Sequence, residues 1–276
     1  MAAQNFSNSL FNDKLWLLGI GAGLIAIHLT IADRVGPGEL LSASLLYWSA
    51  VAYLIWQRRE RLELESGWFS TLLGLSLVSL ILIKSQALGN ADFFLRLLPF
   101  LAALALALIA SGIRGLKQYW QELLILSFLI PHSGLLSQIA DISVSTARST
   151  TVLLWYLGFD VYRQGVYVIL PSGSVEVNPG CAGYSLMMQL LGTSVIFLVM
   201  FPTGWLQKIF LPIAAVMFGF LVNTVRVSIM AVLAASGNQT AFEYWHVGDG
   251  SLIFSAISIT LLGLFCFLTL QPEYEK

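Results

Sequence analysis

Charged residues are scarce in this sequence. Lys, Arg, Asp and Glu make up 11% of its 276 residues, whereas soluble domains carry about 25% charged residues. This composition, with 57% hydrophobic residues, excludes a soluble globular domain. The 14 Lys and Arg residues are balanced by 15 Asp and Glu residues. We therefore expect no nucleic-acid partner, because no excess of positive charge is available to neutralise phosphates.

Cysteine and histidine are also rare. The chain has 2 cysteines, Cys181 and Cys266, and 3 histidines. No CxxC or paired-histidine spacing typical of zinc sites occurs, and no phosphate-binding loop. We expect neither a metal nor a cofactor, and any cysteine chemistry must come from a single thiol. We expect Cys266, His28 and His132 to have structural roles.

Long hydrophobic stretches are what the sequence does contain. A helix needs about 20 apolar residues to cross a hydrocarbon core of about 30 Å. Stretches near this length are residues 15–31, 40–56, 68–83, 93–110, 182–201, 209–235 and 252–270. A further stretch, 119–139, carries a Pro-His-Ser-Gly break at 131–134. The pattern predicts an all-α polytopic membrane protein with about eight transmembrane helices, the first retained as a membrane helix because no cleavage site follows it.

Two segments between the spans are different. Residues 142–158 are too short to cross and combine Ser, Thr and Arg with an apolar end, which predicts an amphipathic helix on the membrane surface. Residues 161–170 and 175–177 are β-branched runs around a Pro/Gly turn. They predict a small extracytoplasmic β-hairpin before Cys181.

Positive charges indicate the orientation. Arg58, Arg59, Arg61, Arg114 and Lys117 fall in loops on one side, which predicts a plasma-membrane protein with both termini cytoplasmic. We expect residues 57–66 to form a solvated cytoplasmic loop. If 152–159 crossed the membrane instead, the last three helices would invert.

We expect one integral membrane domain over 1–276. It would consist of N-terminal spans (15–139), an extracytoplasmic helix and hairpin (140–180) and catalytic spans (181–270).

Cys181 is the first candidate for chemistry. It follows Asn178-Pro179-Gly180 and precedes an apolar stretch, so we expect Asn178 to be the N-cap and Cys181 to lie in the first helical turn. Free N–H groups and the helix dipole there favour a thiolate and would hold an oxyanion. The alternative is that Cys181 only packs near the interface.

Two further candidates belong to the same half of the membrane. Arg226 lies within the stretch 209–235, where an arginine is costly and points to function. Asn223, three residues earlier on the same face, is expected to share its partner. The alternative is a structural pair between Arg226 and a helix carbonyl or an Asp or Glu, although no acid occurs in any neighbouring span. His246 lies in the predicted outer loop before the last helix, where Glu176 or Asp249 is a candidate to orient it.

A thiolate, an imidazole and a fixed cation together suit acyl transfer through a thioester. The sequence therefore predicts an extracytoplasmic site built from Cys181, Arg226 and His246.

The motifs resemble a known family. The run Val-Glu-Val-Asn-Pro-Gly-Cys-Ala-Gly at 175–183, Asn223-Thr-Val-Arg226 within a span, and His246 before a final helix resemble the exosortase/archaeosortase family of membrane cysteine transpeptidases. The form Asn-Pro-Gly-Cys-Ala-Gly resembles its cyanobacterial branch, the cyanoexosortases. Most exosortases have Ser-Gly after the cysteine, where this chain has Ala-Gly.

The resemblance implies a function. Cys181 would attack a peptide bond in the C-terminal sorting signal of an exported protein and form an acyl-thioester. Arg226 and His246 would divide proton donation and transition-state stabilisation between them. Chemistry favours His246 as the acid/base and Arg226 as the charge stabiliser. The sequence also allows the reverse assignment. Family substrates carry a Pro-Glu-Pro-like motif, one membrane helix and a basic tail. Asn178, Gly180 and Asn223 are expected to support the site.

Two other classes of function remain open. One is a small transporter or channel in which Arg226 and Asn223 line a polar path. The other is a membrane assembly factor without catalysis, for which replacing Cys181 would have no effect. The predicted hairpin and Cys181 at a helix start favour the transpeptidase, since a transporter needs neither.

Overall fold

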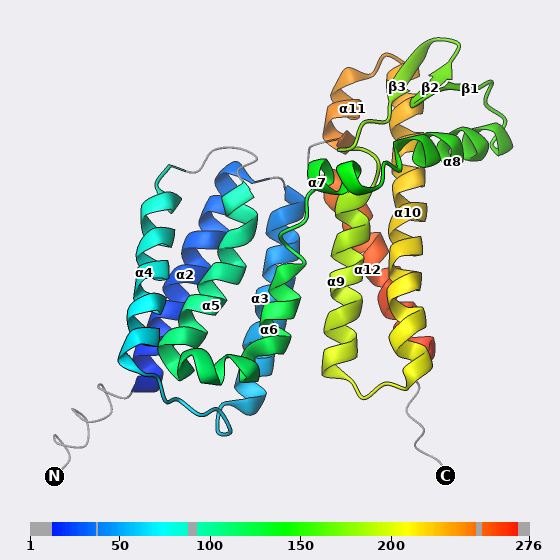
Figure 1. Ribbon diagram of the computed structural model, residues 1–276. Coiled ribbons are helices and arrows are strands. Elements are labelled where there is room, and N and C mark those ends of the chain that lie inside the picture. The colour runs from blue at the N-terminus through cyan, green and yellow to red at the C-terminus, as the bar shows by residue number, and fades with distance from the viewer. Residues whose placement is uncertain (1–12, 37, 88–92, 247–249, 270–276) are drawn as a thin grey trace, which may run out of the picture. The chain divides into compact units, whose positions relative to one another are not determined.

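The computed structural model describes residues 13–36, 38–87, 93–246 and 250–269. These residues are mostly helical and carry a small antiparallel sheet (Figure 1), which confirms the predicted helical class. The chain forms two compact units, Met1–Ile130 (unit 1) and Pro131–Lys276 (unit 2). The division coincides with the predicted break at 131–134.

Unit 1 is a group of helices that run side by side in Figure 1. They are α2 (Asp13–Val35), α3 (Gly38–Arg58), α4 (Trp68–Ser85), α5 (Phe93–Gly115), the 3-10 helix η1 (Leu116–Tyr119) and α6 (Trp120–Ser127). Gly112 has a φ of 63°, which a right-handed helix cannot continue, so the regular part of α5 ends there, close to the predicted end. At Gly74, an added Cβ would lie 2.6 Å from Ile109, so glycine allows α4 and α5 to pack closely.

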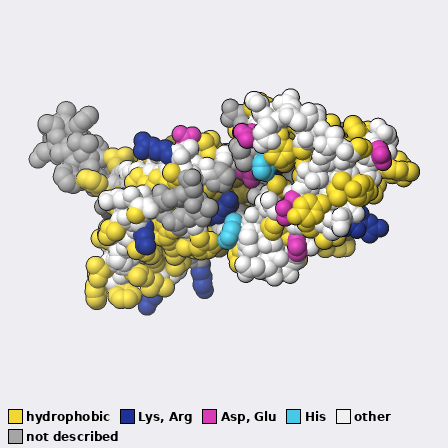
Figure 2. Space-filling view, turned by 90° about the horizontal axis from the view of Figure 1, so that it is seen from above, with side chains coloured by type: hydrophobic (Ala, Val, Ile, Leu, Met, Phe, Trp, Pro, Cys, Tyr) yellow, Lys and Arg dark blue, Asp and Glu magenta, His cyan; other side chains and the backbone are white. Residues whose placement is uncertain are grey.

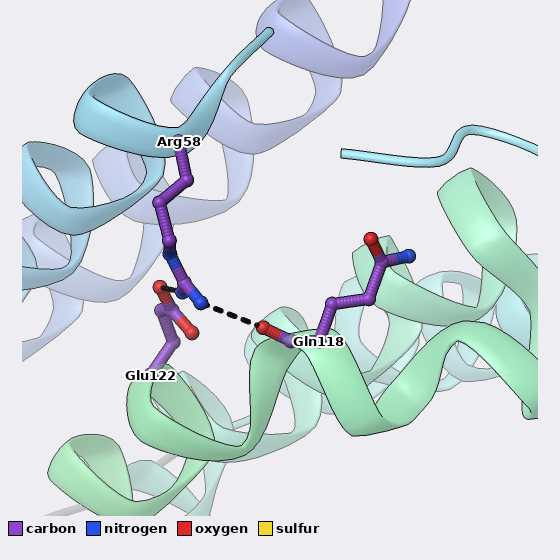
Figure 3. Close-up of polar contacts among 3 residues, drawn as sticks. All are labelled: Arg58, Gln118 and Glu122. Atoms are coloured by element: carbon purple, nitrogen blue, oxygen red, sulfur yellow. Dashed lines mark hydrogen bonds and ion pairs between the residues drawn. The ribbon is translucent and has the colours of Figure 1, made fainter. Parts of the chain in front are cut away.

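A polar cluster joins α3, η1 and α6 at one end of unit 1 (Figure 3). Arg58 forms an ion pair with Glu122, which is 2% exposed. The Nη1 atom of Arg58 also donates to the Gln118 carbonyl at 3.1 Å. The Gln118 amide in turn pairs with the main chain of Glu63 at 3.0 and 3.1 Å. The charged loop 57–66 thus exposes most of its charged side chains, as predicted, while its backbone is tied to η1.

We expect Glu122→Ala to lower the free energy of unfolding by about 1–3 kcal/mol. Breaking a buried ion pair leaves an uncompensated charge; the loss is moderated because the Arg58 side chain is 29% exposed and keeps some water. Thermal unfolding of the purified protein in nanodiscs measures the change. A double-mutant cycle with Arg58→Ala should show coupling between the two sites, and independent, additive effects would contradict this account.

Unit 2 contains the candidate site. Its elements are α7 (Ser133–Ile139), α8 (Ser143–Tyr156), β1 (Tyr162–Gln164), β2 (Tyr167–Leu170), β3 (Gly173–Glu176), α9 (Tyr184–Met200), α10 (Trp205–Ala235), α11 (Gln239–His246) and α12 (Gly250–Thr269). In Figure 1, α9, α10 and α12 run side by side, and the sheet, α8 and α11 gather at one end of α10. At the α9–α10 contact, an added Cβ on Gly219 would lie 2.8 Å from the Met187 Cα.

The sheet has three strands in the order β1-β2-β3, both pairs antiparallel. The predicted two-stranded hairpin is therefore incomplete, because the run 161–170 is itself divided. Gly165, with a φ of 60°, begins a two-residue turn that pairs Gln164 with Tyr167. Val168 and Val175 face the core of unit 2, with Ala147 of α8 and Val227 of α10.

Six segments of the described chain are long and apolar enough to cross a membrane. They are Leu15–Val35, Gly38–Arg58, Trp68–Ser85, Phe93–Ser127, Trp205–Ala235 and Gly250–Thr269. This confirms a multi-pass membrane protein. α9, with 17 residues, is a shorter apolar helix. The predicted span 119–139 is divided into α6 and α7, because the chain leaves the helix after Ser127 and His132 is extended.

Candidate active site

Cys181 lies in a turn before α9. The prediction that it occupies the first helical turn is wrong, because α9 begins at Tyr184 and Gly183 before it has a φ of 104°. That left-handed conformation separates the turn from the helix. Asn178 caps the turn instead: the Cys181 N–H donates to its carbonyl at 2.9 Å and to its Oδ1 at 3.1 Å. The Cys181 amide is thus engaged and is not a free oxyanion donor.

The thiol of Cys181 lies beside the imidazole of His246. Sγ and Nε2 are 3.2 Å apart, and Cys181 is 6% exposed. His246 is the last residue of α11, so the segment predicted as a loop is a short helix. Phe242, one turn earlier on α11, packs its ring 5.3 Å from the imidazole ring. The two atoms are within hydrogen-bond distance, and a thiol beside an imidazole is the arrangement that activates a cysteine nucleophile.

Arg226 connects α10 to the end of α11. It is 9% exposed, and its Nη2 donates to the His246 carbonyl at 2.6 Å. The alternative considered from the sequence, a structural bond to a carbonyl, is present here, but the carbonyl belongs to the candidate catalytic histidine. Arg226 therefore holds the main chain of the residue that contacts the Cys181 thiol and places a fixed positive charge at the end of α11.

Asn223 holds the main chain of Cys181. Its side chain is fully buried, and Nδ2 donates to the Cys181 carbonyl at 2.9 Å. Asn223 and Arg226 are one turn apart on α10, and the bonds described here run to two different carbonyls, those of Cys181 and His246. One face of α10 thus fixes the main chain at both Cys181 and His246.

Gly183→Ala is expected to disturb this arrangement. The new Cβ would lie 2.8 Å from Asn223 Nδ2, and a φ of 104° is strained for any residue with a Cβ. We expect a loss of about 1–3 kcal/mol in the free energy of unfolding and faster alkylation of Cys181 by a small maleimide. Gly67→Ala is the matched control, since nothing lies within 4 Å of its Cβ. Equal stability and alkylation in the two variants would contradict the tight fit.

Two residues that the sequence did not single out also hold the turn. Thr146 of α8 donates its hydroxyl to the Ala182 carbonyl at 2.8 Å. The Tyr184 hydroxyl donates to the Ala140 carbonyl and accepts from the Ile142 N–H at 2.9 Å. Both side chains are buried. Tyr184 follows the cysteine motif, and Thr146 lies on the polar face of the predicted amphipathic helix. These two positions were the available signal in the sequence.

The remaining predicted residues of unit 2 lie in different places. Gly180 is exposed beside Asn178. Glu176 is exposed on β3, paired with Tyr167. Asp249 lies outside the described residues.

His28, His132 and Cys266 are the residues for which we expected structural roles. His28 is fully buried in unit 1 and accepts a hydrogen bond from Trp48 Nε1 at 3.1 Å. His132 precedes α7 as its N-cap. Cys266 is 2% exposed and packs with Leu190 and Leu262.

Comparison with known families identifies the chain. The family model described as transmembrane exosortase matches residues 35–263. The chain belongs to the transmembrane exosortase family. Exosortases are embedded in the membrane and act on exported proteins with C-terminal sorting signals. The matched region of this exosortase contains Cys181, Arg226 and His246, and no curated protein and no solved structure matches the chain.

Proposed function

We propose that this exosortase is a cysteine transpeptidase or peptidase that removes PEP-CTERM-like sorting signals through an acyl-thioester on Cys181. The observation that carries the proposal is the 3.2 Å separation of Cys181 Sγ and His246 Nε2. It supplies a nucleophile with an adjacent base, the pair that covalent acyl transfer requires. The motif Asn-Pro-Gly-Cys-Ala-Gly supports placement in the cyanobacterial branch.

The proposed reaction has two stages. His246 accepts the thiol proton of Cys181, and Sγ attacks the scissile carbonyl carbon of the signal. The tetrahedral intermediate collapses, its C–N bond breaks, and the imidazolium returns the proton to the leaving amine. An acceptor amine, hydroxyl or water then gives its proton to His246 and attacks the thioester carbon. The C–S bond breaks, and the imidazolium returns the proton to the Cys181 sulfur.

Arg226 contributes charge and position. Its guanidinium does not readily release a proton, so we assign the acid/base role to His246. The Nη2 bond to the His246 carbonyl fixes the imidazole, and the positive charge stabilises the oxyanion of the tetrahedral intermediate. Asn223 and Asn178 support the reaction by holding the Cys181 main chain.

We propose the plasma-membrane topology expected from the sequence, with about eight crossings and both termini cytoplasmic. It requires α9 and the divided stretch from α6 to α7 to cross in addition to the six long apolar segments. The 17-residue α9 is about 26 Å long and nearly crosses the hydrocarbon core. Arg58, Arg59 and Arg61 then lie inside, and the Cys181 turn lies outside. A substrate with a membrane helix and a basic tail fits this orientation, since its tail stays inside and its scissile motif reaches Cys181.

The transporter alternative receives less support. A polar path needs side chains directed to a passage, whereas Asn223 and Arg226 donate to the carbonyls of Cys181 and His246. Their hydrogen bonds hold two main-chain segments together at one thiol, which suits catalysis.

The proposal is tested with a substrate protein. Cells would express the exosortase with a secreted protein ending in a Pro-Glu-Pro motif, a membrane helix and a basic tail. We expect removal of the tail, seen as a mass loss, and its retention when the Pro-Glu-Pro motif is replaced by Ala-Ala-Ala. A substrate that keeps its tail beside well-expressed wild-type enzyme would contradict the proposal.

A further inference from the structure

β3 forms one edge of the sheet and is paired with β2 on one side. Just beyond β3, the Val177 N–H donates to the carbonyl of Val166, in the turn before β2, at 3.0 Å. In an antiparallel pair, alternate residues direct their main-chain groups towards the partner strand, so Val175 and Val177 face β2. Ser174 and Glu176 therefore direct their N–H and C=O groups towards the outer edge.

These outer main-chain groups are open to a further strand. Ser174 and Glu176 are both exposed, and no described residue beyond the sheet forms a hydrogen bond with their main chains. The inner face of β3 is covered instead, since Val175 lies in the core with Val227 of α10. Figure 2 looks down on this end of unit 2, where backbone and uncharged polar atoms, drawn white, form much of the surface. An unpaired edge of this kind is a template for another strand.

The open edge leads to the candidate nucleophile. Beyond β3, the chain continues through the exposed residues 178–180 to Cys181. β3 begins at Gly173, where an added Cβ would lie 2.9 Å from the Ala235 Cα. The Cys181 carbonyl is bonded by Asn223 instead, about 18 Å from Ala235 along the axis of α10. A peptide that lies on this edge and runs in the direction of β3 is therefore carried to the Cys181 thiol.

We infer that an extended segment of the exported protein adds to the outer edge of β3 as a further strand and so presents its scissile bond to Cys181. The occupant is a peptide because exosortases act on exported proteins, and strand addition gives affinity through main-chain hydrogen bonds. The inference rests on the proposed function for its direction. The substrate enters the membrane after its motif, so its chain runs towards Cys181 as β3 does, and the added strand is parallel to β3.

The Pro-Glu-Pro motif of the proposed substrates fits such a strand. In an extended chain, consecutive residues direct their main-chain groups to opposite sides. When the glutamate of the motif faces β3, both prolines face away, where the missing N–H costs no hydrogen bond. Proline also favours an extended conformation for the residue before it. The glutamate then donates its N–H to β3 and accepts from β3 at its carbonyl.

Binding of substrate to protein without the nucleophile tests the pairing apart from catalysis. Full-length protein with Cys181→Ala, in detergent, is titrated with a fluorescent exported protein that carries the motif, a membrane helix and a basic tail, and the Kd is measured. Glu176→Pro removes the outer N–H, and proline is tolerated at an edge where its nitrogen faces solvent. It is compared with Glu176→Ala, which loses the same carboxylate but keeps the N–H.

Arg163→Pro is the matched control on the other edge of the sheet. Arg163 lies on β1, which is separated from β3 by β2 (Figure 1). Its N–H points away from β2, because its neighbour Gln164 closes the turn with Tyr167. The control therefore places the same proline at an edge that does not lead to Cys181.

We expect Glu176→Pro to raise the Kd about tenfold above that of Glu176→Ala, the scale of losing one or two main-chain hydrogen bonds. Arg163→Pro should bind as the Cys181→Ala protein does. Equal Kd values for the two Glu176 variants, a similar loss in Arg163→Pro, or no binding by the Cys181→Ala protein itself would overturn the pairing.

A modified substrate repeats the test on unaltered β3 if size-exclusion chromatography shows that Glu176→Pro misfolds. N-methylglutamate in the motif removes the N–H that donates to β3, so its Kd should also rise about tenfold, and unchanged binding would overturn the pairing. These outcomes are separate from catalysis, because Cys181 is absent. If the pairing alone fails, wild-type protein still removes the tail; if the proposed function fails, wild-type protein leaves the tail in place.

Discussion

Cys181→Ala and Cys181→Ser should each slow removal of the sorting signal by about 10³-fold or more, the scale of losing a catalytic nucleophile. Alanine leaves no atom to form the acyl-enzyme. Serine keeps the size, but the pKa of its hydroxyl is far above that of a thiol, so His246 at 3.2 Å activates it poorly. The fraction of substrate that retains its tail, followed over time after expression is induced, measures the effect.

Cys266→Ala is the matched control for the thiol. Cys266 packs among Leu190, Leu211 and Leu262, with no candidate catalytic residue in that cluster. We expect normal processing by this variant once its expression is matched to that of the wild type. Normal processing by both Cys181 variants would remove the transpeptidase and bring forward an assembly factor or a transporter.

Arg226→Ala should reduce processing by about 10²–10³-fold, the usual cost of one preorganised electrostatic group. The change removes the Nη2 bond at 2.6 Å to the His246 carbonyl together with the fixed positive charge. Both losses act on the transition state, through a displaced imidazole and an unstabilised oxyanion. Arg226→Lys keeps the charge but loses the planar fork, so it should recover only part of the rate.

Arg96→Lys controls for arginine replacement within an apolar helix. Arg96 lies on α5 in unit 1 and is half-buried. Rates are compared at equal amounts of folded protein, determined by size-exclusion chromatography of each variant. Wild-type processing by Arg226→Ala would show that the guanidinium takes no part, whereas a similar loss in Arg96→Lys would show a general effect of membrane-protein stability.

The length of the apolar stretches made much of the fold predictable. The stretches 40–56 and 68–83 lie within α3 and α4, because an uninterrupted apolar run of that length has few alternatives to a membrane helix. In the stretch 119–139 the break at 131–134 was predicted, but the composition does not reveal that the helix already ends after Ser127. The single integral domain over 1–276 stays a prediction.

Local backbone geometry limited what the sequence could predict about the site. The identities of Cys181, Arg226 and His246 came from chemistry and motif order, and the structure brings the three together. The start of α9 was misplaced because Asn178 and Pro179 resemble a helix N-terminus, and nothing in the sequence gives the positive φ of Gly183.

Two other errors have similar causes. α11 is amphipathic but only 8 residues long, too short for a clear periodic pattern before the structure is known. The division of the run 161–170 into β1 and β2 depends on Gly165, and a lone glycine between β-branched residues does not specify a turn. The catalytic roles of Cys181, Arg226 and His246 remain predictions for the experiments above.

The most direct test is the mass of the enzyme during turnover. Wild-type protein mixed with substrate in nanodiscs and quenched in acid should carry a substrate fragment on Cys181, identified by peptide mapping and released by hydroxylamine, as a thioester is. Cys181→Ala should carry none. Removal of the sorting signal at a normal rate by wild-type protein with no adduct on Cys181, and the same rate in Cys181→Ala, would contradict the thioester mechanism.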